Sequence, residues 1–280
     1  MADRTYLFID GEYLRRRHHE AMVDFFQVDG DLDIFPLRRE AGARRVYFYD
    51  CIDEAPLPGE TGEVQKTRIA PLQRFLSYVQ SLSGFHVKPG TVRRGRKREQ
   101  KEVDVSMAVD MLTHGFNGTM TKAVLLAGDL DFRPVVEALV RQGVFVEVWY
   151  HRNSIAEELH GAADFGREIR FRQLYEWNTT AFKETHRVPM VQTPGGGPAG
   201  KLLRAGKIRD WGWSAQLYWL ETAQQVPQFS LWIDVPVGRT IRVYDRDENL
   251  VERYVAVQYG PIDWEFVVEE ARIAGQVQDG

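Results

Sequence analysis

The sequence predicts an α/β protein in which a mainly parallel sheet lies between two layers of helices, followed by a small α+β domain. Up to about Trp177, short apolar runs typical of buried strands alternate with amphipathic helical patterns. Such alternation implies crossover connections, which give parallel strands covered by helices on both faces. The character of the chain changes after a Pro/Gly-rich segment at 188–200, beyond which lie five of the seven tryptophans.

The N-terminal elements follow one another regularly. The predicted strands are residues 5–10, 45–50, 85–88, 123–127 and 144–149, with 168–171 as a further short one. The predicted helices are 13–22, 66–82, 102–114 and 134–141, and a capping box at 154–157 opens another. Pro134 suits the first turn of its helix and Gly143 its end. Residues 28–39 fit neither pattern.

We therefore expect a domain at 1–187, a linker at 188–200 and a Trp-rich domain at 201–280. In the domain at 201–280, the pattern of residues 214–225 predicts a helix. Residues 240–244 and 250–258 predict a hairpin closed around a polar turn. Substrate recognition, homo-oligomer formation and binding of a protein partner all remain open as roles for this domain.

Composition indicates a soluble protein of the cytoplasm. The chain is 44% hydrophobic and 27% charged, which is ordinary for a globular protein. Its single cysteine, Cys51, excludes an internal disulfide framework and a multi-cysteine zinc site. No histidine has zinc-site spacing, and neither a signal peptide nor a membrane-spanning run is visible.

Aspartates stand where a parallel sheet forms its sites. Asp10 ends the first strand, Asp129 and Asp131 follow the strand at 123–127, and Asp104 lies in the first turn of a helix. A carboxylate ending an apolar strand is costly, and neighbouring carboxylates repel one another. A divalent cation such as Mg²⁺ removes both penalties and prefers carboxylate oxygens. The four aspartates together therefore predict a metal site.

Helix geometry separates two further candidates. Asp104 and Asp110 are six residues apart, roughly 240° around a helix, so they do not share a face. We expect Asp104 to face the cluster and Asp110 to be a supporting or helix-capping residue, with Lys101 one turn before Asp104. Taken singly, Asp10 could instead bond backbone amides, and Asp129 or Asp131 could cap the following helix.

The segment 88–101, KPGTVRRGRKREQK, holds seven basic residues and one acidic residue, although the formal net charge of the chain is −4. We expect it to contact the phosphate backbone of RNA, because it leads into the helix of Asp104 and carries no interleaved aromatic residues for stacking on bases. A solvated loop is the alternative. The expected RNA-binding residues are Arg93, Arg94, Arg96, Lys97, Arg98 and Lys101.

The segments FIDGEYL, KEVDVSMAVDML and LLAGDLDFRPVVEAL, and later SIAEELHGAADF, resemble in order and spacing the NYN domain family, the LabA-like branch of the PIN-like nucleases, over about residues 4–175. The resemblance implies a PIN-like Rossmannoid three-layer sandwich and a ribonuclease that depends on Mg²⁺ or Mn²⁺. Its metal-binding acids would be Asp10, Asp104, Asp129 and Asp131. In the family's first motif, D-G-x-N is usual, whereas Tyr13 stands at the Asn position here.

Three functions remain. The first is a metal-dependent ribonuclease in which water attacks the phosphorus, leaving a 5′-phosphate. The second, suggested by Tyr13 and the appended domain, is an RNA-binding or regulatory module without catalysis. The third is a phosphatase of the haloacid dehalogenase type with Asp10 as nucleophile, which lacks the second aspartate expected after that nucleophile.

Overall fold

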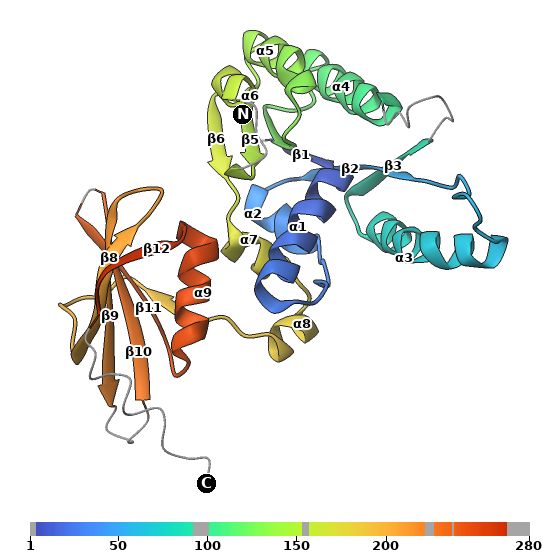
Figure 1. Ribbon diagram of the computed structural model, residues 1–280. Coiled ribbons are helices and arrows are strands. Elements are labelled where there is room, and N and C mark those ends of the chain that lie inside the picture. Colours follow the sequence, from blue (N-terminus) through green and yellow to red (C-terminus); the bar gives the residue numbers. More distant parts are fainter. Residues whose placement is uncertain (1–3, 92–100, 153–156, 222–226, 237, 268–280) are drawn as a thin grey trace. The chain divides into compact units, whose positions relative to one another are not determined.

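The computed structural model describes residues 4–91, 101–152, 157–221, 227–236 and 238–267 (Figure 1). Backbone contacts divide the chain into two compact units. The N-terminal unit comprises Met1–Val23 and Val28–Thr180, and the C-terminal unit comprises Asp24–Gln27 and Ala181–Gly280. No helix in the described ranges is long and apolar enough to cross a lipid bilayer.

The N-terminal unit contains a six-stranded sheet, in the order β3-β2-β1-β4-β5-β6, in which every neighbouring pair is parallel. Its strands are β1 (Thr5–Asp10), β2 (Arg45–Ile52), β3 (Phe85–Thr91), β4 (Lys122–Leu126), β5 (Phe145–Tyr150) and β6 (Phe165–Glu168). The chain first builds outward from β1 to β3, then returns beside β1 with β4 and builds the other way. The predicted parallel sheet is therefore confirmed, with a reversal of strand order between β1 and β4.

Helices cover both faces of this sheet (Figure 1). Those on one side are α1 (Gly11–Phe26), α2 (Phe35–Ala41) and α3 (Gly62–Ser81), and those on the other are α4 (Lys101–Phe116), α5 (Arg133–Arg141) and α6 (Glu157–Ala162). Strand β1 shows why two layers are needed, because its residues are buried on both faces. Phe8 belongs to the core cluster shared with Met107 of α4 and Leu139 of α5.

The strand predicted at 168–171 was wrong: β6 ends at Glu168, and α7 (Phe171–Glu176) begins where the strand was expected. In the stretch 28–39, which fitted neither pattern, α2 has Pro36 in its first turn and is capped after Ala41 by Gly42, which has a φ of 61°. The capping box at 154–157 falls largely outside the described residues.

The C-terminal unit contains a six-stranded antiparallel sheet in the order β12-β8-β9-β10-β11-β7, so the predicted α+β class is confirmed. Its strands are β7 (Met190–Gln192), β8 (Lys201–Ile208), β9 (Trp213–Glu221), β10 (Pro227–Val235), β11 (Arg239–Asp245) and β12 (Ile262–Val267). Its helices are α8 (Thr180–Thr185) and α9 (Glu248–Tyr259), and α9 contacts β10 and β11.

The elements of this region were predicted less well. The helix at 214–225 was wrong, because β9 buries Ala215 and Leu217 with the two-residue period of a strand. The hairpin was also wrong in its second half. Residues 250–258 belong to α9, which is capped by Asp247 and buries Leu250 and Tyr254 one turn apart. Part of the expected linker forms β7, which pairs with β11.

Candidate active site

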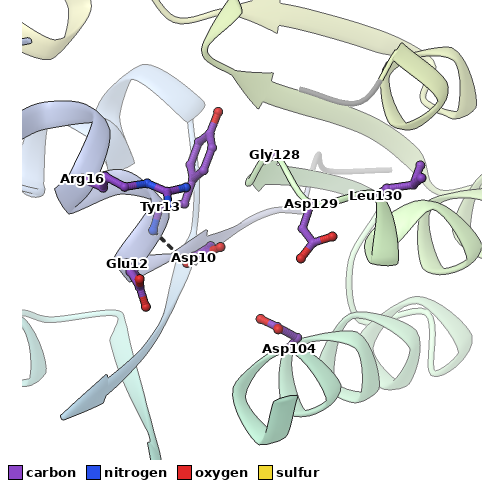
Figure 2. Close-up of a pocket in the computed structure, with 8 residues that line it drawn as sticks. All are labelled: Asp10, Glu12, Tyr13, Arg16, Asp104, Gly128, Asp129 and Leu130. Carbon is purple, nitrogen blue, oxygen red and sulfur yellow. Dashed lines mark hydrogen bonds between the residues drawn. The ribbon is translucent and has the colours of Figure 1, made fainter. Parts of the chain in front are cut away.

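A pocket of about 390 Å³ lies in the N-terminal unit, where the carboxyl ends of β1 and β4 meet. This is the point at which strand order reverses, the usual position of ligand sites in parallel α/β sheets. Three segments far apart in the chain contribute to it: the β1–α1 junction, the first turn of α4 and the segment after β4. The lining residues are Asp10, Glu12, Tyr13, Arg16, Asp104, Gly128, Asp129 and Leu130 (Figure 2).

Asp10 is the last residue of β1, and its Oδ1 accepts a hydrogen bond from the backbone amide of Tyr13 at 3.0 Å. Burial raises the pKa of this carboxyl to about 7, against the lowering effect of that hydrogen bond, and the charges of Asp104, Glu12 and Asp50 raise the pKa further. The backbone-bonding alternative thus holds for Asp10, but one amide does not compensate its burial. A cation in the pocket would stabilise its charged form.

Asp104 reaches the same pocket from α4, where it is half-buried. Burial raises its pKa to about 6, and the charges of Asp129, Asp131 and Glu12 contribute in the same direction. Asp110 does not line the pocket. Its Oδ2 accepts a hydrogen bond from the Tyr49 hydroxyl at 2.7 Å and lies 3.3 Å from Lys88 Nζ. The two aspartates of this helix therefore have different surroundings.

Asp129 follows β4 and is exposed. It caps the 3-10 turn η1 (Leu130–Phe132), because its Oδ1 accepts a hydrogen bond from the backbone amide of Asp131 at 2.9 Å. The capping alternative and the pocket-lining position therefore both apply to Asp129. Asp131 is exposed and does not line the pocket, but its charge raises the pKa of Asp104.

The sequence reasoning missed Glu12 and Arg16, which line the pocket from α1. Both are exposed and four residues apart, so they lie on the same helix face one turn from each other. That spacing, directly after the strand-end Asp10, was the signal available in the sequence.

Gly11 permits the junction between β1 and α1 to lie against β2. A Cβ atom at this position would lie 2.5 Å from Asp50 Oδ2 and 2.7 Å from the carbonyl oxygen of Tyr49. Asp50 is fully buried, and Arg15 donates hydrogen bonds to its two oxygens from Nε and Nη2, each at 2.8 Å. The first two turns of α1 are thus fixed against β2 by close packing and a two-point ion pair.

Tyr13 is tied to the other side of the sheet. Its ring is buried, and its hydroxyl accepts a hydrogen bond from the backbone amide of His151, just after β5, at 2.8 Å. The residue at the motif's usual Asn position therefore forms part of the pocket wall and supports α1.

The sequence profile of the NYN domain matches residues 4–168, more than half of the chain. The chain belongs to the NYN domain family. Its N-terminal unit therefore has the PIN-like fold of a nuclease family.

Comparisons with curated proteins and with solved structures add little to the family assignment. No curated protein matches the chain. Among solved structures, it is similar to a protein of unknown function from Vibrio parahaemolyticus, with 17% sequence identity and a TM-score of 0.41. That similarity covers 60% of this chain and 93% of the other.

The donor set of this NYN domain suits a hard divalent cation, because the described residues that line the pocket include four carboxylates and no histidine or cysteine. The geometry is less complete. In the described part of the chain, no group of three or more His, Cys, Asp or Glu side chains is arranged to hold a metal ion. A cation would therefore have to draw these carboxylates together, and it would stabilise the charged forms of Asp10 and Asp104, whose pKa values are raised in its absence.

Several predicted residues fall outside what the structure describes. They are Arg93, Arg94, Arg96, Lys97 and Arg98, and the side chain of Lys101 is also outside the described part. The expected RNA-binding role of this segment stays a prediction. Cys51 is half-buried, and its thiol lies 3.5 Å from the carbonyl oxygen of Gly90.

Proposed function

We propose that this NYN domain protein is a ribonuclease that depends on Mg²⁺ or Mn²⁺. One observation carries the proposal: carboxylates from β1, α4 and the segment after β4 line a single pocket at the reversal of strand order. Figure 2 shows the carboxyl groups of Asp10, Asp104 and Asp129 facing the same space. The family assignment favours this function over the phosphatase alternative.

In this proposal Asp10, Asp104 and Asp129 hold the cation, and Asp131 orients water or serves as a further ligand. When bound, a divalent cation supplies activation of water and stabilisation of charge on the phosphate oxygens. The chain's own contribution is to fix the carboxylates. Asp10 is held by the Tyr13 amide, and Asp129 by the Asp131 amide. Attack by water, with the 3′ oxygen leaving, yields a 5′-phosphate and a 3′-hydroxyl.

In this proposal the basic segment 88–101 contacts the substrate strand, because its cations suit the phosphate backbone. This segment leads directly into α4, the helix that supplies Asp104. The C-terminal unit is proposed to mediate an oligomeric or protein contact. The presence of a single cysteine suits a reducing cytoplasm.

The test is cleavage of a defined RNA panel with Mg²⁺, Mn²⁺ or EDTA, with the product ends mapped. We expect the wild type to cut RNA only with the divalent cation and to leave 5′-phosphates. Asp10→Asn and Asp129→Asn should abolish cleavage while leaving the circular dichroism spectrum unchanged. The matched control is Asp29→Asn, because the Asp29 side chain is 78% exposed and lies outside the pocket. Full activity in both pocket variants would exclude the proposal.

A catalytically inactive RNA-binding module is the second candidate. It is favoured by Tyr13, whose hydroxyl is engaged by His151, and by the lack of a preformed coordinating group in the described residues. Tight RNA binding with no cation-dependent turnover under any of these conditions would decide for it.

A further inference from the structure

Three consecutive arginines on α1 have three different environments. Arg15 pairs with the buried Asp50 through two hydrogen bonds of 2.8 Å. Arg17 pairs with Glu20, with its Nη2 at 2.8 Å from Oε1. Arg16, between them, is exposed, and within the described ranges it has no hydrogen bond or ion pair.

Arg16 is nevertheless beside many potential partners. Among the described residues that line the acidic pocket, Arg16 is the one cation, and Asp10, Glu12, Asp104 and Asp129 are the acids. Arg16 and Tyr13 project from the same side of the pocket, one turn of α1 apart (Figure 2). A guanidinium that lines such a pocket without bonding its carboxylates keeps all five N–H donors available for a ligand.

The support of α1 makes this arginine well positioned. The first turn of the helix is bonded to Asp10 through the Tyr13 amide and to His151 through the Tyr13 hydroxyl. The residue directly before Arg16 is also fixed, because Arg15 forms an ion pair with Asp50 of β2. Arg16 therefore projects from a rigid element into the pocket, which is how a fixed phosphate contact is built.

The charge of the pocket indicates what such an arginine would bind. An RNA phosphate entering a space lined by four carboxylates meets repulsion that must be compensated by a nearby cation. A guanidinium presents paired N–H groups that match two oxygens of a phosphate. Resting on the proposed RNA substrate, we propose that Arg16 binds a backbone phosphate of the strand at this pocket, as a residue distinct from the basic segment 88–101.

Binding rather than turnover provides the test. The full chain would be titrated against a short, fluorescently labelled single-stranded RNA in EDTA, where a metal-dependent enzyme cannot cut. Anisotropy would be recorded at several salt concentrations. Arg16→Ala should weaken binding about tenfold, which corresponds to about 1.4 kcal/mol. It should also reduce the slope of log affinity against log salt by about 0.7, the value for one lost phosphate contact on a single strand.

Two further variants sharpen the result. Arg16→Lys should keep the wild-type salt slope but bind more weakly than wild type, because the charge remains and the paired geometry is lost. Arg74→Ala is the matched control, since Arg74 is an exposed arginine of α3 that does not line the pocket. It should bind as wild type does. Equal affinity and equal slope for Arg16→Ala and Arg74→Ala would overturn the role of Arg16.

The outcome can be separated from that of the proposed function. If Arg16→Ala shows the expected loss but the wild type never cleaves RNA with Mg²⁺ or Mn²⁺, the phosphate contact stands and the nuclease proposal fails. If the wild type cleaves RNA and Arg16→Ala binds normally, only the role of Arg16 fails. Absence of any RNA binding by the wild type in EDTA would overturn the role of Arg16 alone, because the nuclease proposal is tested by cleavage with Mg²⁺ or Mn²⁺.

Discussion

The hydroxyl of Tyr13 accepts a hydrogen bond from the backbone amide of His151 across 2.8 Å, although the two residues are 138 positions apart. The bond joins the first turn of α1 to the end of β5, on the far side of β4 in the sheet. Because Tyr13 also lines the acidic pocket, one side chain both supports the helix and forms the wall of the site.

Tyr13→Phe should therefore lower the free energy of unfolding by about 1 kcal/mol, because it removes one part-buried hydrogen bond and leaves the ring in place. Urea denaturation followed by circular dichroism would measure the loss. Tyr78→Phe is the control. Tyr78 is an exposed residue of α3, and its hydroxyl forms a long, exposed hydrogen bond of 3.4 Å with Asp33. Equal stability of the two variants would show that the Tyr13 bond contributes nothing.

Burial of Asp10 makes the metal-free protein sensitive to pH. The pKa of this carboxyl is raised to about 7 in the folded state, above the ordinary value of 3.8. Between these two values the folded state holds a proton that the unfolded chain has released. The free energy of unfolding should therefore fall as pH rises from about 4 to about 8, at up to about 1.4 kcal/mol per pH unit for one group.

The variant Asp10→Asn isolates this contribution, because asparagine keeps an oxygen for the Tyr13 amide and does not titrate. In EDTA, it should gain stability relative to wild type as the pH is raised from 5 to 8. Denaturant melts at several pH values would measure that difference. A constant difference across this range would show that Asp10 does not carry the pH dependence.

A divalent cation should oppose this loss of stability. Mn²⁺ should raise the melting temperature more at pH 8 than at pH 5.5, because protons on Asp10 and Asp104, with pKa values of about 7 and 6, compete with the cation. A Mn²⁺ concentration about a hundredfold above the dissociation constant would raise the free energy of unfolding by about 2.7 kcal/mol. Thermal melts with increasing Mn²⁺ would follow the effect.

Variants test whether that effect arises at the pocket. Asp10→Asn and Asp129→Asn should lose most of the Mn²⁺-dependent increase in melting temperature, whereas Asp29→Asn should keep it. The same increase in all three variants would place the bound cation elsewhere in the molecule.

The close approach at Gly11 gives a prediction about folding. Gly11→Ala places a methyl group 2.5 Å from Asp50 Oδ2 and 2.6 Å from the ring of Phe48, so α1 or β2 must shift. We expect a loss of about 1–3 kcal/mol in the free energy of unfolding, the range for overpacked sites. Gly62→Ala is the control at the start of α3, where no atom lies within 4 Å of the added carbon. It should be neutral or stabilising, and an equally small effect at both glycines would contradict the steric argument.

The sequence by itself determined the architecture of the N-terminal unit. Its strands are short apolar runs separated by helical patterns, and local periodicity is a reliable signal when a strand is buried on both faces. The same signal misled in the C-terminal unit. The stretch 250–258 carries Val and Tyr residues that favour strands, yet α9 forms there because its apolar residues can be buried one turn apart.

The candidate site divides in the same way. The sequence alone predicted Asp10 and Asp129 as site residues, because both come at the ends of predicted strands and parallel strands end at one edge of a sheet. Only the tertiary structure decided that Glu12 and Arg16 also line the pocket and that Asp131 does not. It alone showed that Tyr13 bonds His151 and that Asp50 engages Arg15. The contacts of Tyr13 and Asp50 depend on which side chains packing brings together across the sheet, and no local pattern in the chain encodes those partners.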